Sequence, residues 1–418
     1  MPSVANFDIA QNLKVEMFLP LEADNLFLIG LSYIGGDDVL GASTTFIIGT
    51  SLIGSNDLLS DNTLPGFAWQ EYEASTVQVE TELGGTIQSS LYFQPEPGSA
   101  TITLQGFDID PSVNKSIRPG ARIRVRVVSP GVDSYLFNGF IDSIDVTYGS
   151  AGNNWNTIRI RAYDSHKRLM NSRVAVYDTT GYHGGNHATP LEAITTAVTA
   201  AGFTMSSASE VLNHKLPTES ETQVIIGSKI LDAIKTGLGV FWIEADTQKV
   251  KVINRPSIIV TPPAGTLTVG NNHGESNHLC MSAINVRADN DVTFNSLRVS
   301  NSNNSAEYVV KTDQDNIDLY GIFALDVDIN TTPDGQLFKW ADEVFAQNPT
   351  KIVESVSTPA IDRTGTLTGA AFLTPGTPLG VKYTKSPLLI DDYYTITKIR
   401  HSIDVNAWTT TLELWKEF

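Results

Sequence analysis

Apolar and polar residues alternate in several short stretches between Trp69 and Arg161. The alternating apolar positions are Val77 and Val79, Ile102 and Leu104, Ile123, Val125 and Val127, and Ile158 and Ile160. A period of two is typical of strands that bury one face. Turn sequences such as LGGT, RPGA and SPGVD separate the stretches, as in barrels and sandwiches built from short strands. This pattern predicts a β domain over residues 69–170.

The pattern changes to a helical period after residue 171. Thr189, Pro190 and Glu192 provide an N-cap, a first-turn proline and a capping-box acid. The apolar residues that follow on one helical face are Leu191, Ile194, Val198 and Ala201. A second apolar stripe consists of Ile230, Leu231 and Ile234, and a hairpin that turns near Asp246 comes after it. These signals predict a small α+β lobe over residues 171–272.

Strand-like patterns return after Leu279, with one helical interruption. In TPDGQLFKWADEVFAQNP the apolar residues have helical spacing, and Pro333 and Pro349 bound the segment. The closing stretch ITKIRHSIDVNAWTTTLEL is similar to FIDSIDVTYGSAGNNWNTIRI in the first β domain, because each is typical of a hairpin with a tryptophan and a threonine before its second strand. We therefore predict a second β domain with one helix over residues 273–418. The predicted fold is mainly β with an α+β insert, and the two β domains are interpreted as related.

Length and composition exclude several classes of protein. The 418 residues suggest two or three domains, and a hydrophobic share of 41% is typical of a globular chain. The longest apolar stretch, near Leu26 to Ile34, is far shorter than the roughly 20 residues that span a bilayer. The first residues lack the basic start and apolar run of a secretory signal, so we expect synthesis in the cytoplasm without a signal peptide. Cys280 is the only cysteine, which excludes a disulfide framework and a thiolate zinc site.

The chain is strongly acidic. Its 46 acidic and 28 basic residues leave a formal net charge of −18. This balance argues against a surface that grips a phosphate backbone, because lysine and arginine provide that grip. It suits either plain solubility or a surface that nucleic acid passes without sticking.

A strip of arginines stands out against this acidic background. The arginines that alternate with apolar residues are Arg122, Arg124, Arg126, Arg159 and Arg161. A strand places them on the face opposite its apolar side chains. Two interpretations stay open. One is cross-strand pairing with local acids such as Asp142 or Asp145, and the other is a docking strip for another subunit.

Motifs for catalysis, metal binding and nucleotide binding are absent or incomplete. GLSYIG and GTSLIG resemble a nucleophile elbow but carry an extra residue before the second glycine. Acid pairs occur at Asp37 and Asp38, at Asp108 and Asp110, and at Asp391 and Asp392. Adjacent acids in turns are mostly solvated turn formers. His183 and His187 have i,i+4 spacing but lack the glutamate of an HExxH motif. We predict no catalytic, metal-binding or nucleic-acid-binding residues and no cofactor.

Five pieces of the sequence occur in an order that resembles a known family. They are GSATITLQGFDIDPSVNKSIRPGARIRVRV, YLFNGFIDSIDVTYG, DNIDLYGIFALDVDI, LFKWADEVFAQNP and YYTITKIRHSIDVNAWTTTLEL. Together they resemble the minor tail proteins that form the baseplate or tail-tip hub of tailed bacteriophages, from about Trp69 to Phe418. The chain departs from the family pattern at Ile322 and Phe323, where arginine is frequent, and at Gly380 and Val381, where GD is frequent.

The resemblance implies two tube-like β-barrel domains separated by the α+β lobe. It also implies a homotrimer in which two barrels per subunit form a pseudo-sixfold ring against a hexameric tail tube. The implied partners are a distal tail or tail-tube protein, a tape measure protein, and tail fibre or tip proteins, at the distal end of the virion tail. The chain would be a structural hub and no enzyme. DNA would pass through it transiently, so we expect an acidic or neutral channel lining. A receptor- or carbohydrate-binding tail protein is the alternative, and a cell-wall hydrolase is a weaker one.

Two similar segments of about fifteen residues, 27–41 and 46–60, lie in a predicted N-terminal extension over residues 1–68. Their matched apolar positions include Phe27 and Phe46, and Ile29 and Ile48. Each segment is interpreted as a strand and a turn that cannot bury its apolar side alone. We expect that side to be covered by the protein's own barrel, by a neighbouring subunit or by another tail component.

Overall fold

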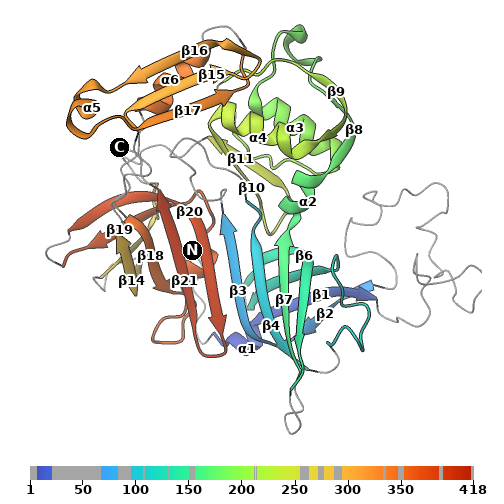
Figure 1. Ribbon diagram of the computed structural model, residues 1–418. Coiled ribbons are helices and arrows are strands. Elements are labelled where there is room, and N and C mark those ends of the chain that lie inside the picture. Colours follow the sequence, from blue (N-terminus) through green and yellow to red (C-terminus); the bar gives the residue numbers. More distant parts are fainter. Residues whose placement is uncertain are drawn as a thin grey trace, which may run out of the picture.

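The computed structural model describes residues 7–20, 67–82, 96–106, 109–129, 131–149, 156–210, 212, 214–254, 263–271, 277–286, 294–332, 336–346, 353–385 and 389–415. These residues form a large β-sheet, with an α+β lobe and a smaller sheet on one side of it (Figure 1). The two repeated segments, with Phe27, Ile29, Phe46 and Ile48, lie outside the described residues. No helix among the described residues is long and apolar enough to cross a membrane.

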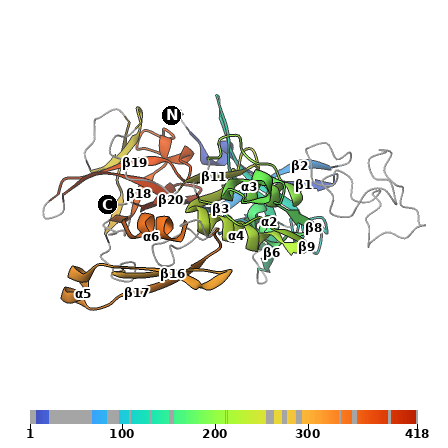
Figure 2. The same ribbon diagram turned by 90° about the horizontal axis from the view of Figure 1, so that it is seen from above.

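The first β module makes up one half of the large sheet. Its strands are β1 (Leu13–Pro20), β2 (Phe67–Tyr72), β3 (Ala74–Glu82), β4 (Ser99–Gln105), β5 (Arg122–Ser129), β6 (Val132–Thr147) and β7 (Thr157–Asp164). They follow the antiparallel order β3-β4-β7-β6-β5-β1-β2. β1 and β2 lie at the end farthest from the second module (Figure 2). β1 follows the short helix α1 (Ile9–Asn12) and pairs with β5, so residues 13–20 belong to this sheet.

The second β module makes up the other half of the sheet. Its strands are β12 (Leu267–Gly270), β13 (His278–Cys280), β14 (Ala283–Val286), β18 (Val353–Pro359), β19 (Pro378–Tyr383), β20 (Ile390–Asp404) and β21 (Trp408–Trp415). β14, β18, β21, β20 and β19 are antiparallel neighbours in that order. β12 pairs in parallel with both β19 and β13, and the 3-10 helix η4 (Gly369–Phe372) precedes β19.

The α+β lobe lies between the two modules in the sequence. Its elements are α2 (Ser165–Asn171), β8 (Arg173–Asp178), η3 (Tyr182–Gly185), α3 (Pro190–Ala200), β9 (Ser220–Ile225), α4 (Ile226–Gly237), β10 (Gly239–Ile243) and β11 (Val250–Asn254). The predicted capping box is present: the Glu192 amide donates to Thr189 Oγ1 at 3.3 Å, and the Thr189 amide donates to Glu192 Oε2 at 2.8 Å. At the tip of the β10–β11 hairpin, Asp246 Oδ1 accepts from the Tyr135 amide at 2.9 Å, which attaches the lobe to the first module.

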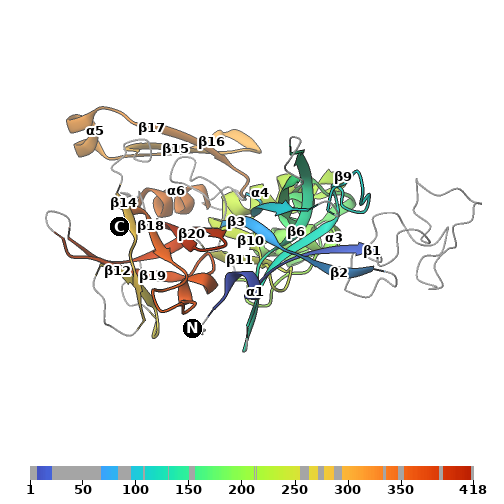
Figure 3. The same cartoon turned by 90° about the horizontal axis from the view of Figure 1, so that it is seen from below.

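A separate three-stranded sheet lies within the predicted second β domain. It consists of β15 (Ser296–Asn301), β16 (Asn304–Thr312) and β17 (Ala324–Ile329), with α5 (Gln314–Tyr320) and α6 (Gln336–Ala346). α6 is the helix predicted between Pro333 and Pro349, and it lies between this sheet and the second module (Figure 3). Trp340 of α6 is fully buried, and its Nε1 donates to the Lys235 carbonyl at 3.1 Å. The small sheet is therefore linked to the lobe through α6. Its strands are separate from the large sheet, a division that the sequence pattern did not predict.

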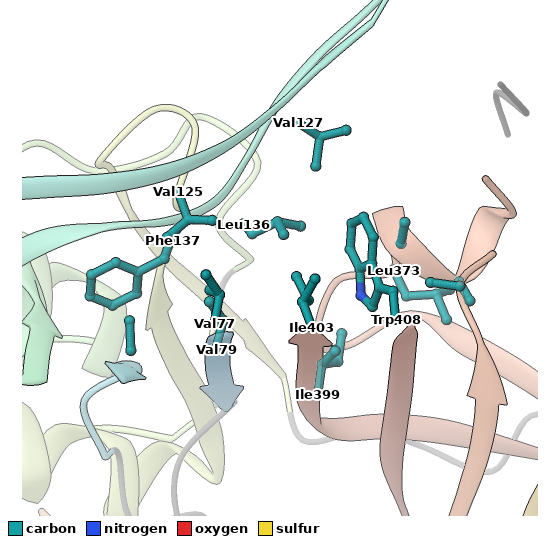
Figure 4. Close-up of a cluster of buried hydrophobic side chains, with 14 of the residues drawn as sticks. Val77, Val79, Val125, Val127, Leu136, Phe137, Leu373, Ile399, Ile403 and Trp408 are labelled. Atoms are coloured by element: carbon teal, nitrogen blue, oxygen red, sulfur yellow. The ribbon is translucent and has the colours of Figure 1, made fainter. Parts of the chain in front are cut away.

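One strand pair joins the two modules. β20 pairs with β3, from Lys398 opposite Glu82 to Asp404 opposite Thr76, and this produces a sheet of 14 strands among the described residues. Buried side chains from both modules meet beneath the pair, among them Val77, Val79, Leu136, Leu373, Ile399, Ile403 and Trp408 (Figure 4). Full burial of one such side chain stabilises a fold by roughly 1.5–3 kcal/mol. The shared core therefore holds the modules together as one body.

Candidate functional site

The two β modules repeat one strand order, because β3-β4-β7-β6-β5 corresponds to β14-β18-β21-β20-β19. Their longest strands, β6 and β20, carry a bulge at the same place, after Ile141 and after Ile396. The Gly120 amide donates to the Ile141 carbonyl at 2.8 Å, and the Gly376 amide donates to the Ile396 carbonyl at 2.8 Å. Both glycines have positive φ, 89° and 81°, at the end of an RPG and a TPG turn. The chain therefore contains two versions of one module, as the matching hairpins predicted.

The pairing of β20 with β3 turns four strands of each module into one continuous surface, in the order β14-β18-β21-β20-β3-β4-β7-β6. Residues directly opposed on neighbouring strands share a face of the sheet. One row of opposed residues reads Pro359, Thr409, Ser402, Gln78, Thr101, Arg161 and Ser143. The next row reads Ile403, Val77, Ile102, Ile160 and Ile144 and faces the core. The face of the first row is called the polar face below.

The polar face carries mostly hydroxyl and amide side chains. Its uncharged polar residues are Thr76, Gln78, Ser99, Thr101, Thr103, Gln105, Ser143, Thr147, Thr157, Asn285, Ser355, Ser357, Ser402, Thr409 and Thr411. Acids and bases are mixed on it: Arg400 Nε donates to Glu80 Oε2 at 2.8 Å, and Lys398 also pairs with Glu80. The face therefore does not form a basic patch.

Arg159 and Arg161 lie on the polar face, where the alternation placed them, and both are exposed. Asp145 stands directly opposite Arg159 in the β6–β7 ladder. Asp142, the other acid considered as a partner, accepts instead from Lys167 Nζ at 2.5 Å. Exposure leaves the two guanidinium groups accessible from the open side of the sheet.

Arg122, Arg124 and Arg126 lie on β5, next to β1 and beyond the polar face. Arg124 Nε donates to Glu16 Oε2 at 2.6 Å, and Arg126 Nη1 donates to Glu16 Oε1 at 3.1 Å. Arg126 Nη2 also donates to Asp133 Oδ2 at 2.8 Å. Burial alone would lower the pKa of Arg126, but its hydrogen bonds to Asp133 and Glu16 raise that pKa above the usual value. Arg124 and Arg126 therefore have local acidic partners, as one of the two interpretations expected, although the acids are not the two considered.

An aromatic side chain completes this cluster. The Trp69 ring centre lies 3.8 Å from the guanidinium carbon of Arg124 and 5.4 Å from that of Arg122, within cation–π range. Arg124 is only 7% exposed. Sequence reasoning missed Glu16 and Trp69 as partners. The alternation in LKVEMFLP, now β1, was the signal that could have revealed the strand that carries Glu16.

Asp110, from the DIDP stretch, anchors the loop that leads to the RPG turn. Its Oδ1 accepts from the Ser112 amide at 2.8 Å, and its Oδ2 accepts from Asn156 Nδ2 at 3.0 Å. Hydrogen bonds from the Ser112 side chain and backbone, with smaller ones from Tyr148 and Asn156, lower the pKa of Asp110. The carboxylate thus ties this loop to the β6–β7 hairpin, which is a structural role.

The two histidines singled out by spacing do lie together. The rings of His183 and His187 stack with centres 4.3 Å apart, and His183 Nε2 lies 3.2 Å from Glu192 Oε2. No group of three or more side chains suited to a metal ion occurs in the described part of the chain. Cys280 is exposed.

Comparison with known proteins gives a fold. No protein-family model and no curated protein matches the sequence. Among solved structures, a tail protein from Neisseria meningitidis MC58 is similar with a TM-score of 0.56 and 13% identity, over 84% of this chain and 93% of that one. The 43 kDa tail protein of prophage MuSo2 from Shewanella oneidensis is similar with a TM-score of 0.55 and 11% identity, over 83% and 95%. The chain has the mainly β fold of phage tail proteins, which confirms the predicted fold class.

Proposed function

We propose that this chain is a structural, non-enzymatic hub protein of a phage tail tip or baseplate, and that three copies form a ring. The observation that carries the proposal is the polar face, which two versions of one module build as a single surface. A trimer of such chains presents six similar modules, and a sixfold tail tube can dock onto them. The similarity to tail proteins over more than four-fifths of the chain supports a place in the tail.

The polar face is proposed to line the channel of the ring. Phosphate groups bind where lysine and arginine release counterions in numbers. Here the basic residues Arg159, Arg161, Lys398 and Arg400 are interspersed with Glu80, Asp145, Asp404 and Glu413 on the same face. Hydroxyl and amide groups between them interact with water as readily as with phosphate. Such a lining suits transient passage of DNA.

The remaining surfaces are available for other tail components. The proposed partners are a distal tail or tail-tube protein, a tape measure protein, and fibre or tip proteins, at the distal end of the virion tail. The arginine strip and the repeated segments with Phe27, Ile29, Phe46 and Ile48 stay proposed contact regions.

Sedimentation and negative-stain microscopy of the purified chain, alone and with its neighbouring tail proteins, test this function. We expect trimers that appear as rings with a central hole, and no binding of duplex DNA at ~0.15 M salt. A strict monomer in every mixture would contradict the hub. A ring that binds duplex DNA tightly at that salt would contradict the passive channel.

A further inference from the structure

We propose that β6 of one chain pairs with β14 of a second copy, in the register that β20 and β3 use within a chain. This inference rests on the proposed function for the number of copies in the ring. It goes further by naming the two strand edges that meet and the residues that face each other across them.

The two modules have equivalent strands, and one pair of them already meets inside the chain. β20 is the fourth strand of the second module and β3 is the first strand of the first module, and these two strands pair inside the chain. By the same strand order, β6 is the fourth strand of the first module and β14 is the first strand of the second. A ring that alternates the two modules therefore needs one further junction, of β6 with β14. These are two different surface patches, and head-to-tail contacts of this kind form a ring when the rotation from one copy to the next closes after a whole number of copies.

The end of β6 is more exposed than the equivalent part of β20. On β20, His401 is 4% exposed and Ile403 is 2% exposed, because β3 lies beside them. Counted from the shared bulge, the corresponding residues of the first module are Val146 and Tyr148. Val146 is only partly buried and Tyr148, directly after β6, is 62% exposed. Between Ser143 and Thr147, β6 pairs with β7 alone among the described strands.

The other edge shows the same contrast. Val79 of β3 is fully buried against β20, whereas its counterpart Val286 of β14 is 40% exposed. β14 pairs with β18 alone in the described part of the chain. An exposed strand edge with apolar side chains favours pairing with another strand. Both edges therefore expose apolar groups, whereas the internal junction buries the equivalent positions of β20 and β3.

An open cavity lies beside β6 in the first module. In the first module Ile117, Ile144, Val146 and Tyr148 line an open cavity of about 420 Å³. The corresponding cavity of the second module, lined by Leu373, Ile399 and His401, is about 260 Å³. Thr81 of β3 and Leu136 of β6 form part of its wall, together with residues of the β10–β11 hairpin such as Trp242, so the neighbouring module and the lobe close it together. A second copy beside β6 would cover the open cavity of the first module from the side that the neighbouring module covers in the second.

The internal junction sets the register. Ser402 faces Gln78, His401 faces Val79 and Ile403 faces Val77 across β20 and β3. Transferred to the copies, this register places Thr147 opposite Asn285, Val146 opposite Val286 and Tyr148 opposite Ile284. The polar pair falls on the polar face and the two apolar pairs face the core, so the contact buries matched side chains.

Cysteine cross-linking of the full chain tests this register. The Cys280→Ser variant removes the native thiol, and Thr147→Cys with Asn285→Cys places one cysteine on each edge. The matched control is Ser402→Cys with Gln78→Cys, the equivalent pair that already faces within the chain. A second control, Thr147→Cys with Ala283→Cys, shifts the register by two residues. After mild oxidation we expect the first variant to give at least about fivefold more covalent trimer than the shifted one, because disulfides need Cβ atoms close together.

The outcomes separate the two proposals. If the chain sediments as a trimer and the internal control links, but Thr147→Cys with Asn285→Cys does not, the register is overturned and the hub stands. A chain that is monomeric in every mixture overturns both. A link that forms only with another tail protein, or only within one chain, overturns the second copy as the occupant of these edges.

Discussion

The indole Nε1 of Trp408 donates a hydrogen bond to Nδ1 of His401 at 3.2 Å, inside the core that joins the two modules. Thr410 Oγ1 lies 3.0 Å from the same nitrogen. An indole N–H can only donate, so Nδ1 is the unprotonated nitrogen of a neutral imidazole. Burial lowers the pKa of His401 to about 4.

We expect acid to weaken the module junction through His401. Above pH ~6.5 the histidine is neutral in both folded and unfolded chains. As the pH falls from ~6.5 to about 4, the unfolded chain takes up a proton that the folded chain refuses, and stability drops by up to roughly 3 kcal/mol. Denaturant unfolding at several pH values measures the loss.

His401→Gln should be less stable at pH 7.5 but should lose less on acidification. Burial also lowers the pKa of His166 to about 4, so part of the pH dependence should remain in the variant, and a variant with undiminished dependence would contradict the assignment.

Glu16 is expected to matter more than its position near the N-terminus suggests. Its side chain is 12% exposed and binds Arg124 and Arg126, so Glu16→Gln leaves two largely buried cations short of a partner. We expect a loss of about 2–4 kcal/mol in the free energy of unfolding. Glu71→Gln is the matched control, because Glu71 is 51% exposed and pairs with Lys14 on the same ribbon. For Glu71→Gln the loss in the free energy of unfolding should stay below about 0.5 kcal/mol. Equal losses in the two variants would show that burial of the ion pair does not determine its contribution to stability.

The equivalent glycines offer a test of the module repeat. Gly120 and Gly376 both have positive φ and close the same turn onto the bulge of the long strand. We expect Gly120→Ala and Gly376→Ala each to cost roughly 1–2 kcal/mol, from the strain of a left-handed backbone. Gly181 has φ of −73° and no atom within 4 Å of an added Cβ, so Gly181→Ala should be nearly neutral. Thermal unfolding of the three variants measures these changes. A loss of stability in only one of Gly120→Ala and Gly376→Ala would show that the two turns are not equivalent.

The sequence predicted the strand faces well because alternation is a local signal. Val77, Ile102 and Ile160 point into the core as the period of two required, and the capping box at Thr189 is formed. Strand neighbours are not a local signal. The pairing of Arg400 with Glu80 joins residues separated by 320 positions, and no pattern at either end names the other.

The partners of the arginine strip could not be predicted from local sequence either. Alternation predicted that Arg124 faces away from the core, and it does. Its burial comes from Glu16 and Trp69 on two strands that a long segment separates in sequence. Sequence alone left pairing and docking open because the decision depends on that tertiary contact. Likewise, the strands of the small sheet alternate like those of the large one, so periodicity could not separate the two sheets.

Charge on the polar face should control how the hub treats DNA. Gln78, Thr101 and Ser402 are opposed neighbours in one row across the centre of that face. Changing all three to lysine adds three positive charges per chain where a passing duplex would lie. We expect the wild-type ring not to retain duplex DNA at ~0.15 M salt, and the variant to bind at least about tenfold more tightly at ~0.05 M salt, with affinity that falls steeply as salt rises. Fluorescence anisotropy with a labelled duplex measures both.

The control variant, Asn304→Lys, Ser305→Lys and Thr312→Lys, adds the same charge at exposed positions of β16, outside the proposed channel. Since those lysines cannot surround a threaded duplex together, they should raise the affinity much less. Equal binding by the two variants would show that the polar face does not enclose DNA, and would return the channel lining to an open question.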